Sequence, residues 1–469
     1  MAALCLSGCT LPFDPQHLPA DAGDAGVDMD AGPDCPEPPR VSSCAGEPAG
    51  ALCTRDTMAG RCHDEECCVT CVGVAGCRDA PSVVACGVGG EACEACEAED
   101  CVAGVCTPAI AATWLSLSVD HSCVIGVDAR VRCWGRPRQP ADAEGDHLGG
   151  SPVDVDDARV GPVAGELRAG RVYAGWYSVS PTPEMAHSCA IDEGGGAWCW
   201  GKNDQGQLGV TPPALGLDAP GRVDIPVQVA EMALGNRVTF AVSADREAVW
   251  GWGQGLSGRA PLSLDRATPP FSSLTASRTA ACVIDGPGTV WCWGTGPTGP
   301  EPDEEPQRLP GLDSAVSVSA ARAHACALSG AGQVWCWGEA GLAALGPRSS
   351  DGPARPAPLE MPGTWLEVAL GDAHTCAVRE EPTCPRSTTV HCWGEADFGQ
   401  LTGEVTAASV EPVEVPLEGG QRWHGLACGG RRCCVMDALG RPHCWGGQDH
   451  GELFGGGRTR APFVVGLDP

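Results

Sequence analysis

The 469-residue chain is 43% hydrophobic and 19% charged, a balance that excludes a protein disordered throughout its length. Its net charge of −30, from 60 acidic and 30 basic residues, repels polyphosphates, so we predict no nucleic-acid binding. The 65 glycines and 41 prolines, with short apolar runs between them, indicate a turn-rich all-β protein.

The N-terminus and the 30 cysteines both favour export, because a reducing cytosol would keep most cysteines as thiols. Leu6-Ser7-Gly8-Cys9 resembles the cleavage site of a bacterial lipoprotein signal, which predicts Cys9 as the lipidated residue. Residues 1–9 would then be the end of a signal that starts upstream, since eight residues without a positive region are too short. The alternative is an accidental match. No other stretch approaches 18 apolar residues, so we expect membrane contact through the lipid alone.

Two segments without a hydrophobic core follow the signal. Residues 10–34, rich in Asp, Ala, Gly and Pro, predict a disordered acidic linker. Residues 35–108 hold 13 cysteines but few large apolar side chains, which predicts a small module held by disulfides. The pairs Cys68/Cys71 and Cys93/Cys96, with His63 nearby, have zinc-ribbon spacing. Zinc is therefore the alternative there, but the cysteine density and export favour disulfides.

Seven Trp-Gly steps, each at the end of a short apolar run, recur between residues 109 and 469 at intervals of 41 to 66 residues. Their tryptophans are Trp134, Trp200, Trp252, Trp293, Trp337, Trp393 and Trp445. A unit of this length with several short strands is typical of one propeller blade. The region therefore predicts a seven-bladed β-propeller, in which we expect each indole ring to pack between adjacent blades.

Six of the steps read Cys-Trp-Gly, and each of these cysteines has an upstream partner. The predicted disulfides are Cys123/Cys133, Cys189/Cys199, Cys282/Cys292, Cys326/Cys336, Cys376/Cys392 and Cys434/Cys444. Positions placed symmetrically about a hairpin turn face each other within disulfide reach. In the third repeat we assign Ala241 and Gly251 to the cysteine positions, so both partners are missing together, which favours pairing within each hairpin. Cys384, Cys428 and Cys433 stay outside the scheme, and Cys384 is a candidate for a bond to the N-terminal module.

The complete unit reads His-x-Cys-Ala, a turn, Val-x-Cys-Trp-Gly and then Gly-Gln-Leu-Gly, as in 324–338 and 206–209. This pattern is similar to the regulator-of-chromosome-condensation repeat family in its bacterial, cysteine-containing form, over about 360 residues. The resemblance implies blades of four strands, each repeat beginning with a Pro-x-x-Val strand. The last such match, 462–465, has no hairpin after it, and the first repeat has no such strand before it. We therefore expect the C-terminal strand to join the first blade and close the ring.

The histidine of the unit has no obvious catalytic partner. It recurs at His121, His187, His324 and His374, and we assign its position elsewhere to Thr239, Ala280 and Arg432. A metal ring at the propeller axis is one alternative. Because the replacements cannot all bind a metal, we predict a hydrogen-bonding role, with no metal and no cofactor.

No Gly-x-Ser-x-Gly, His-Glu-x-x-His or phosphate-loop motif occurs, so we predict that the protein is not an enzyme. We predict an exported, lipid-anchored monomer of the outer membrane or cell surface that acts as a protein-interaction scaffold. Its partner, an unknown protein, would contact the insertions at 137–160, 178–186, 212–222 and 380–388. Two alternatives remain open: a secreted inhibitor or regulator of a hydrolase that uses one propeller face, and a guanine-nucleotide-exchange-like regulator.

Overall fold

The computed structural model describes most of the chain beyond residue 110. The described segments are 111–119, 121–135, 146–150, 153–154, 159–165, 167–175, 186–211, 215–256, 258–264, 266–277, 280–294, 306–338, 343–347, 355–382, 384–417, 422–447 and 459–467. N-terminal to these it gives only the backbone of short strands. They are β1 (Leu52–Arg55), β2 (Met58–His63), β3 (Glu66–Cys68), β4 (Val72–Gly73), β5 (Gly76–Cys77), β6 (Asp100–Val102) and β7 (Val105–Thr107).

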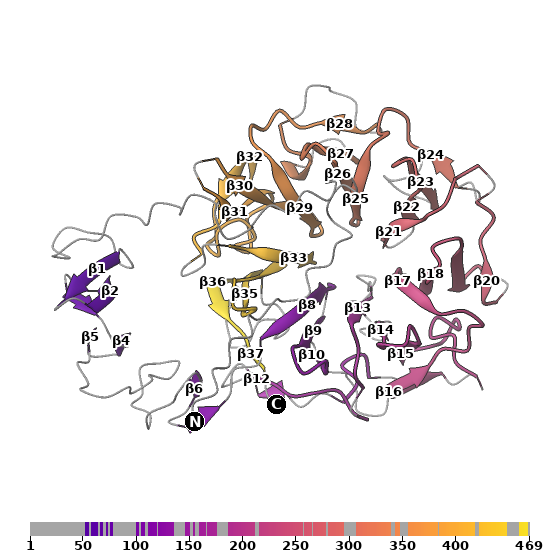
Figure 1. Cartoon of the computed structure of the whole chain (residues 1–469), viewed down its shortest axis with the longest axis horizontal. Helices are drawn as coiled ribbons and strands as arrows, with labels where there is room; N and C mark the ends of the chain where they lie inside the picture. The colour runs from indigo at the N-terminus through magenta and orange to yellow at the C-terminus, as the bar shows by residue number, and fades with distance from the viewer. Residues whose placement is uncertain are drawn as a thin grey trace, which may run out of the picture.

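Seven antiparallel sheets stand around a common axis in these segments and form a β-propeller (Figure 1), which confirms the predicted fold class. The innermost strands are β8 (Ala112–Leu117), β13 (Arg171–Ala174), β17 (Val229–Leu234), β21 (Ser272–Ala276), β25 (Ala315–Ala320), β29 (Trp365–Leu370) and β33 (His424–Gly429). The second strands are β9 (His121–Gly126), β14 (His187–Ile191), β18 (Val238–Ser243), β22 (Ala280–Ile284), β26 (His324–Ser329), β30 (His374–Glu381) and β34 (Arg432–Met436).

The outer half of each blade begins with the strand that carries Trp-Gly. These third strands are β10 (Val131–Gly135), β15 (Ala197–Lys202), β19 (Val249–Gly253), β23 (Val290–Gly294), β27 (Val334–Gly338), β31 (Cys384–Gly394) and β35 (Pro442–Gly447). Blades two to seven add a fourth strand: β16 (Gly216–Arg222), β20 (Ala260–Pro261), β24 (Gln307–Arg308), β28 (Ala357–Pro358), β32 (Ser409–Glu414) and β36 (Thr459–Val464). A short 3-10 helix, η2 (Ala343–Leu345), follows the third strand of blade five.

The second strands are the most deeply buried elements of the propeller, because a neighbouring blade covers each of their two faces. In β9, β14, β22, β26 and β34 every residue is buried. Such strands read as continuous apolar runs rather than alternating ones. The hydrophobic core is therefore a set of clusters between blades, with one cluster at each junction.

The ring closes differently from the expectation. β36 contains most of the 462–465 segment, pairs with β35 and completes blade seven, while the first blade stays a three-stranded sheet. Pairing with β35, which lies just before it in the chain, closes a far shorter loop than pairing with the first blade. Only β37 (Gly466–Leu467) reaches the N-terminal side, where it pairs in parallel with β12 (Arg159–Val160), a strand that β11 (Val153–Asp154) also joins.

Blades seven and one are joined mainly through side chains and loops. The Arg432 guanidinium donates from Nε to the Ser122 hydroxyl at 3.2 Å and from Nη1 to the Val119 carbonyl at 3.0 Å. The backbone N–H of Ala112 also donates to the Gly440 carbonyl, at 2.6 Å.

Several N-terminal predictions lie outside the described residues. These are the lipidation of Cys9, the linker at 10–34 and the pairing of the 13 cysteines in 35–108. None of the helices among the described residues is long and apolar enough to cross a membrane.

Candidate functional site: the blade junctions and the central channel

The structure places all six predicted cysteine pairs in hairpin disulfides. These are Cys123–Cys133, Cys189–Cys199, Cys282–Cys292, Cys326–Cys336, Cys376–Cys392 and Cys434–Cys444. In each, the two cysteines are register partners on the second and third strands, with Cα atoms 4.0–4.1 Å apart. All twelve are at most 1% exposed. A seventh bond, Cys428–Cys433, joins β33 to β34 across a turn and uses two of the cysteines that the repeat pattern did not pair. The side chain of Cys384 lies outside the described residues.

The pairing around Cys199 differs between the two sides of its strand, which the repeat pattern did not predict. Toward β14 the register is regular, and Cys199 faces its disulfide partner Cys189. Toward β16, Cys199 faces Gly221 but Gly201 faces Leu217, so the register shifts between Cys199 and Gly201. Register shifts also follow Cys392 and Cys444 in blades six and seven. The irregularity therefore lies on the outer side of the strand and leaves the hairpin bond in place.

The third blade has a different register from the one assigned to it. Gly251 faces Phe240, whereas Ala241 faces Trp250. The turn between β18 and β19 is one residue longer than in the five hairpins whose cysteines are 10 residues apart, which moves the cysteine-equivalent position back to Phe240. A Cβ added at Gly251 would meet the Phe240 ring at 3.1 Å, so the ring covers the space that a disulfide fills elsewhere.

This register predicts which engineered disulfide can form. The double variant F240C/G251C is expected to oxidise fully, because its cysteines are direct register partners. The matched control A241C/G251C is expected to keep two free thiols, because its positions are offset by one residue and point to opposite faces. Thiol titration of the purified variants distinguishes them. Oxidation of the control alone would mean that the blade-three register is wrong.

Each tryptophan of the repeat packs on the preceding blade. Trp200 lies in one cluster with Cys123 and Cys133, and Trp337 lies in another with Cys282 and Cys292. The same relation holds for Trp134, Trp252, Trp393 and Trp445. All six are at most 1% exposed. The indole therefore covers the neighbour's disulfide, which explains why Cys and Trp recur together.

Trp293 is the informative exception, because the blade before it has no disulfide. Its ring lies edge-on to that of Phe240, with ring centroids 5.4 Å apart, and it is 9% exposed. An aromatic pair of this geometry takes the place of the indole–disulfide contact. Phe240 thus replaces both the missing bond and the surface on which the next blade packs.

The Gly-Gln-Leu-Gly turn positions the tryptophan of the following blade. Trp252 Nε1 donates to the Gln207 carbonyl at 2.8 Å, and Trp445 Nε1 donates to the Gln400 carbonyl at 3.0 Å. The turn's last glycine, Gly209, has φ +64°, and a Cβ there would collide with the Trp252 indole. The glycine after each tryptophan is constrained as well: Gly201 has φ +99°, and a Cβ there would press on the Ala186 carbonyl. The repeat pattern therefore describes one contact between blades, which we call the inter-blade joint: the Gly-Gln-Leu-Gly turn, the tryptophan of the following blade and the glycine after that tryptophan.

The histidines belong to the same joint. Nε2 of His121, His187 and His324 lies 2.8–2.9 Å from the hydroxyls of Ser188, Thr239 and Thr375 respectively, each on the following blade. Each hydroxyl donates its own proton to a turn carbonyl, that of His147, Gln207 or Ala344. The histidine must therefore donate from Nε2, which identifies the neutral Nε2–H tautomer. The predicted hydrogen-bonding role is what this geometry supports.

The register corrects one assignment and shows that the two halves of the joint match. Val238, not Thr239, stands at the histidine position of blade three, and Thr239 is the hydroxyl partner of His187. On the blades that follow Val238 and Ala280, the position of the hydroxyl is occupied by alanine, at Ala281 and Ala325 respectively. Where the histidine position of one blade is polar, the hydroxyl position of the next blade is polar too, and where the first is apolar, so is the second. The hydroxyls escaped the sequence analysis because each contacts a histidine 51 to 67 residues away.

Burial keeps His187, His324 and His374 neutral. It lowers the pKa of His187 to about 3, that of His324 to about 4 and that of His374 to about 3, because a charged ring would lose its hydration. In each ring Nδ1 is buried without a hydrogen-bond partner, so a second proton would have no acceptor.

Stability should consequently fall as the solution becomes acidic. Below about pH 6.5 the histidines of the unfolded chain become protonated, whereas those of the native protein stay neutral until about pH 3–4. The free energy of unfolding therefore decreases as the pH falls. Each histidine contributes up to about 1.4 kcal/mol per pH unit. Guanidinium denaturation between pH 7 and 4.5 measures the slope. The control H324A/T375A, which copies the Ala280/Ala325 junction, should have a shallower slope; equal slopes would contradict the assignment.

The inner strands surround a central channel with a cavity of about 330 Å³. Its titratable lining groups are Arg171, Tyr173 and Glu231. Arg171 donates to the Ala230 carbonyl at 3.0 Å, and Glu231 accepts from the Leu274 N–H at 2.7 Å. Burial raises the pKa of Tyr173 to about 12, so its phenol stays neutral. Both charged groups are thus bonded to the next blade's backbone.

The predicted insertions differ in structure. Most of 212–222 is β16, the fourth strand of blade two, rather than a loop. The segment 380–388 extends the β30–β31 hairpin, in which Glu380 pairs with Thr388 and Glu381 with Cys384. Residues 136–145 and 176–185, which make up much of the other two insertions, lie outside the described residues.

Comparisons with known proteins show a match to one repeat segment and a similar fold. Residues 186–207 match the profile of the "Regulator of chromosome condensation (RCC1) repeat". The structure is similar to that of human WBSCR16, at 17% identity and a TM-score of 0.54, over 70% of this chain and 86% of that one. It is also similar to Prp20p from Saccharomyces cerevisiae, at 17% identity and a TM-score of 0.55, over 75% of this chain and 87% of that one. Yeast RCC1 (Prp20) bound to Kap60 matches with the same identity and TM-score, over 75% of this chain and 85% of that one. One segment of the chain, residues 186–207, therefore matches the regulator-of-chromosome-condensation repeat, and the fold of the chain is similar to that of these human and yeast proteins.

Proposed function

We propose that this chain is an exported propeller, anchored by a lipid on Cys9, that binds another protein through its non-repeating segments. The main support is that the recurring polar groups are used within the ring. Three of the histidines, their hydroxyl partners and the channel carboxylate each bond to an adjacent blade. The indole N–H groups of Trp200, Trp252, Trp393 and Trp445 bond to carbonyls of the connection from the preceding blade. Recognition is then left to the surface segments that differ between blades.

Two further observations support export and a non-enzymatic role. Seven disulfides among the described residues indicate an oxidising environment. The two charged groups of the channel, Arg171 and Glu231, hydrogen-bond to the backbone of the next blade. A catalytic role for either group would require it to give up that hydrogen bond. Propellers of this fold do bind proteins: Prp20p has binding properties to Gsp1p and histones, and yeast RCC1 is bound by Kap60.

The extended β30–β31 hairpin is the candidate contact segment. Its two strands, of 8 and 11 residues, are the longest that the structure describes, and Pro382 near its tip is exposed. At its base, the Thr388 hydroxyl donates to the Trp423 carbonyl at 2.9 Å, which fixes the hairpin against blade seven. A rigid projection on a rigid ring suits protein recognition.

Localisation tests this proposal. The protein, tagged at its C-terminus and expressed from its own gene, is expected in the envelope fraction with a covalent lipid. C9A is expected to lose the lipid and leave the membrane. Cytosolic wild-type protein with free thiols would overturn the proposal.

A photo-crosslinking residue tests the hairpin separately. Placed at Glu380, it should give one discrete protein adduct in living cells. Val127, which is 56% exposed in the first blade's turn, is the matched control and should give none. Equal labelling at both positions would remove the hairpin as the contact.

A further inference from the structure

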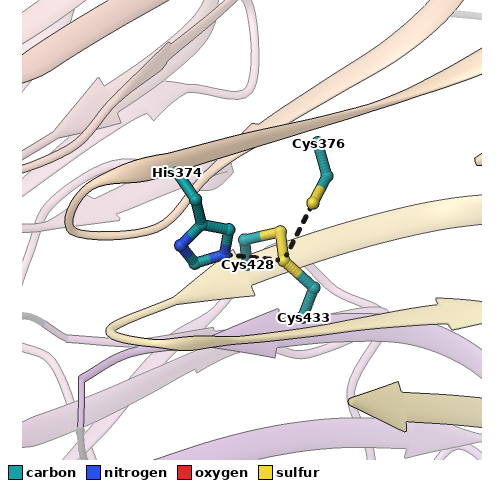
Figure 2. A group of neighbouring side chains, drawn as sticks. All are labelled: His374, Cys376, Cys428 and Cys433. Atoms are coloured by element: carbon teal, nitrogen blue, oxygen red, sulfur yellow. Dashed lines mark hydrogen bonds between the residues drawn. A yellow bond between two sulfur atoms is a disulfide. The ribbon is translucent and has the colours of Figure 1, made fainter. Parts of the chain in front are cut away.

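The junction between blades six and seven brings the Cys428–Cys433 disulfide close to Cys376 and His374 (Figure 2). Cys376 is itself bonded to Cys392. The ligand atoms of His374, Cys376, Cys428 and Cys433 all lie within 4.8 Å of one another. Sγ of Cys433 lies 3.4 Å from Sγ of Cys376, and Nε2 of His374 lies 3.1 Å from Sγ of Cys433. Because all three sulfurs are in the disulfides Cys376–Cys392 and Cys428–Cys433, none is a thiolate that could bind a metal.

Cys433 occupies the hydroxyl position of the inter-blade joint. Its register partner is Trp445, as Ser188 is that of Trp200 and Thr375 that of Trp393. The histidine of the preceding blade, which donates to a hydroxyl elsewhere, faces sulfur here. A thiolate accepts such a hydrogen bond better than a disulfide sulfur does, so His374 favours release of Cys433 as a thiolate.

Cys428 is the accessible member of the group. It is partly exposed and lines the central channel, whereas Cys376, Cys392 and Cys433 are fully buried. The cavity of about 330 Å³ is large enough for a small thiol. The Cys428–Cys433 loop spans only five residues, so closing it stabilises the fold less than closing the ten-residue loops does.

We propose that Cys428 is a reactive site for small thiols in the central channel, and that Cys433 passes the resulting exchange on to Cys376. A thiolate, RS⁻, attacks Sγ of Cys428; the RS–Cys428 bond forms and Cys433 leaves as a thiolate. That thiolate attacks Sγ of Cys376, so a Cys376–Cys433 bond forms and Cys392 leaves. Cys392 takes up the proton that the incoming thiol released. One thiol enters and one thiol appears, with no other oxidant or reductant.

The outcome is a disulfide between blades in place of two disulfides within blades. The 3.4 Å contact between Sγ of Cys376 and Sγ of Cys433 distinguishes these two disulfides from the others. Near Cys326–Cys336, for example, no sulfur of a second disulfide lies that close among the described residues. Blade six would be linked covalently to blade seven, next to the closure of the ring. The inference does not depend on the protein's partner or on its anchor.

Brief exposure of the native, oxidised protein to 2-mercaptoethanol tests the exchange. After acid quenching, free thiols are alkylated in denaturant and the peptides are mapped by mass spectrometry. The expected products are an adduct on Cys428, an alkylated Cys392 and a Cys376–Cys433 peptide, with Cys326–Cys336 intact. An adduct on Cys428 with the free thiol on Cys433 would overturn the transfer step. No adduct on Cys428, or equal reaction at Cys326–Cys336, would overturn the reactive site.

The variant C428S/C433S provides the control. It places a hydroxyl opposite His374, as in three other joints, so the ring should fold. The alkylation of Cys392 that follows exposure to 2-mercaptoethanol should then be lost. Labelling at the wild-type rate would show direct attack on Cys376–Cys392 and refute the transfer through Cys433.

Discussion

Complete reduction of the disulfides is expected to unfold the propeller at neutral pH and room temperature. Five hairpin bonds span 10 residues and the sixth, Cys376–Cys392, spans 16. By the chain-entropy relation each contributes roughly 2–3 kcal/mol. The six hairpin bonds together contribute on the order of 15 kcal/mol, as much as the whole free energy of folding of a typical domain, about 5–15 kcal/mol. Losing them leaves too little to offset the chain entropy.

Near-UV circular dichroism of the oxidised and the reduced, alkylated protein measures this effect, because it reports the packing of the buried tryptophans. The oxidised protein should retain a structured tryptophan signal that the reduced protein lacks. A single-bond control, C326S/C336S, should remain folded and lose only roughly 2–3 kcal/mol. A fully reduced protein with an unchanged signal and melting temperature would contradict the structural role of the bonds.

Trp200→Ala is expected to destabilise the protein by about 3–5 kcal/mol, the cost of truncating a fully buried aromatic side chain. The Trp200 indole packs against the Cys123–Cys133 bond and donates to the His147 carbonyl at 2.9 Å. Its removal opens a cavity between the first two blades. The midpoint of guanidinium denaturation measures the loss.

Trp198→Ala is the matched control. Trp198 lies on the same strand but is only partly buried, and its Nε1 donates within its own blade to Asp192 at 2.8 Å. Its truncation should cost about 1 kcal/mol, the typical effect of a single substitution. Equal losses in the two variants would show that the indole at the blade junction has no special role.

The ring could be predicted from the sequence because tryptophan and cysteine, two uncommon residue types, mark each repeat. Cys-Trp-Gly repeats with a spacing that only short strands and tight turns fill, so the number of blades and the hairpin pairs follow from local geometry. The structure adds that Trp and Cys of one unit serve different junctions. Trp337 covers the disulfide of blade four, whereas its neighbour Cys336 is covered by Trp393 of blade six.

The errors arose where one residue changes a register or where distant segments meet. A single extra residue in the turn after β18 moved the cysteine position from Ala241 to Phe240, and composition alone does not reveal that shift. The register shift beside Cys199 escaped for the same reason, since the Cys-Trp-Gly motif specifies the inner partner of its strand and not the outer one. The strand at 462–465 was assigned to the wrong blade, because the Pro-x-x-Val pattern indicates an edge strand but does not indicate the blade to which that strand belongs. The contact between Cys433 and Cys376 joins two repeats, so no spacing within one repeat could predict it.

The most direct test is a disulfide map of the protein taken from its own cells, with thiols blocked at lysis. The predicted result is the six hairpin bonds from Cys123–Cys133 to Cys434–Cys444, together with Cys428–Cys433. Such a map would show a ring whose blades pack on each other's disulfides in an oxidising compartment. Free thiols at these positions, or Cys326 bonded to any residue other than Cys336, would contradict it.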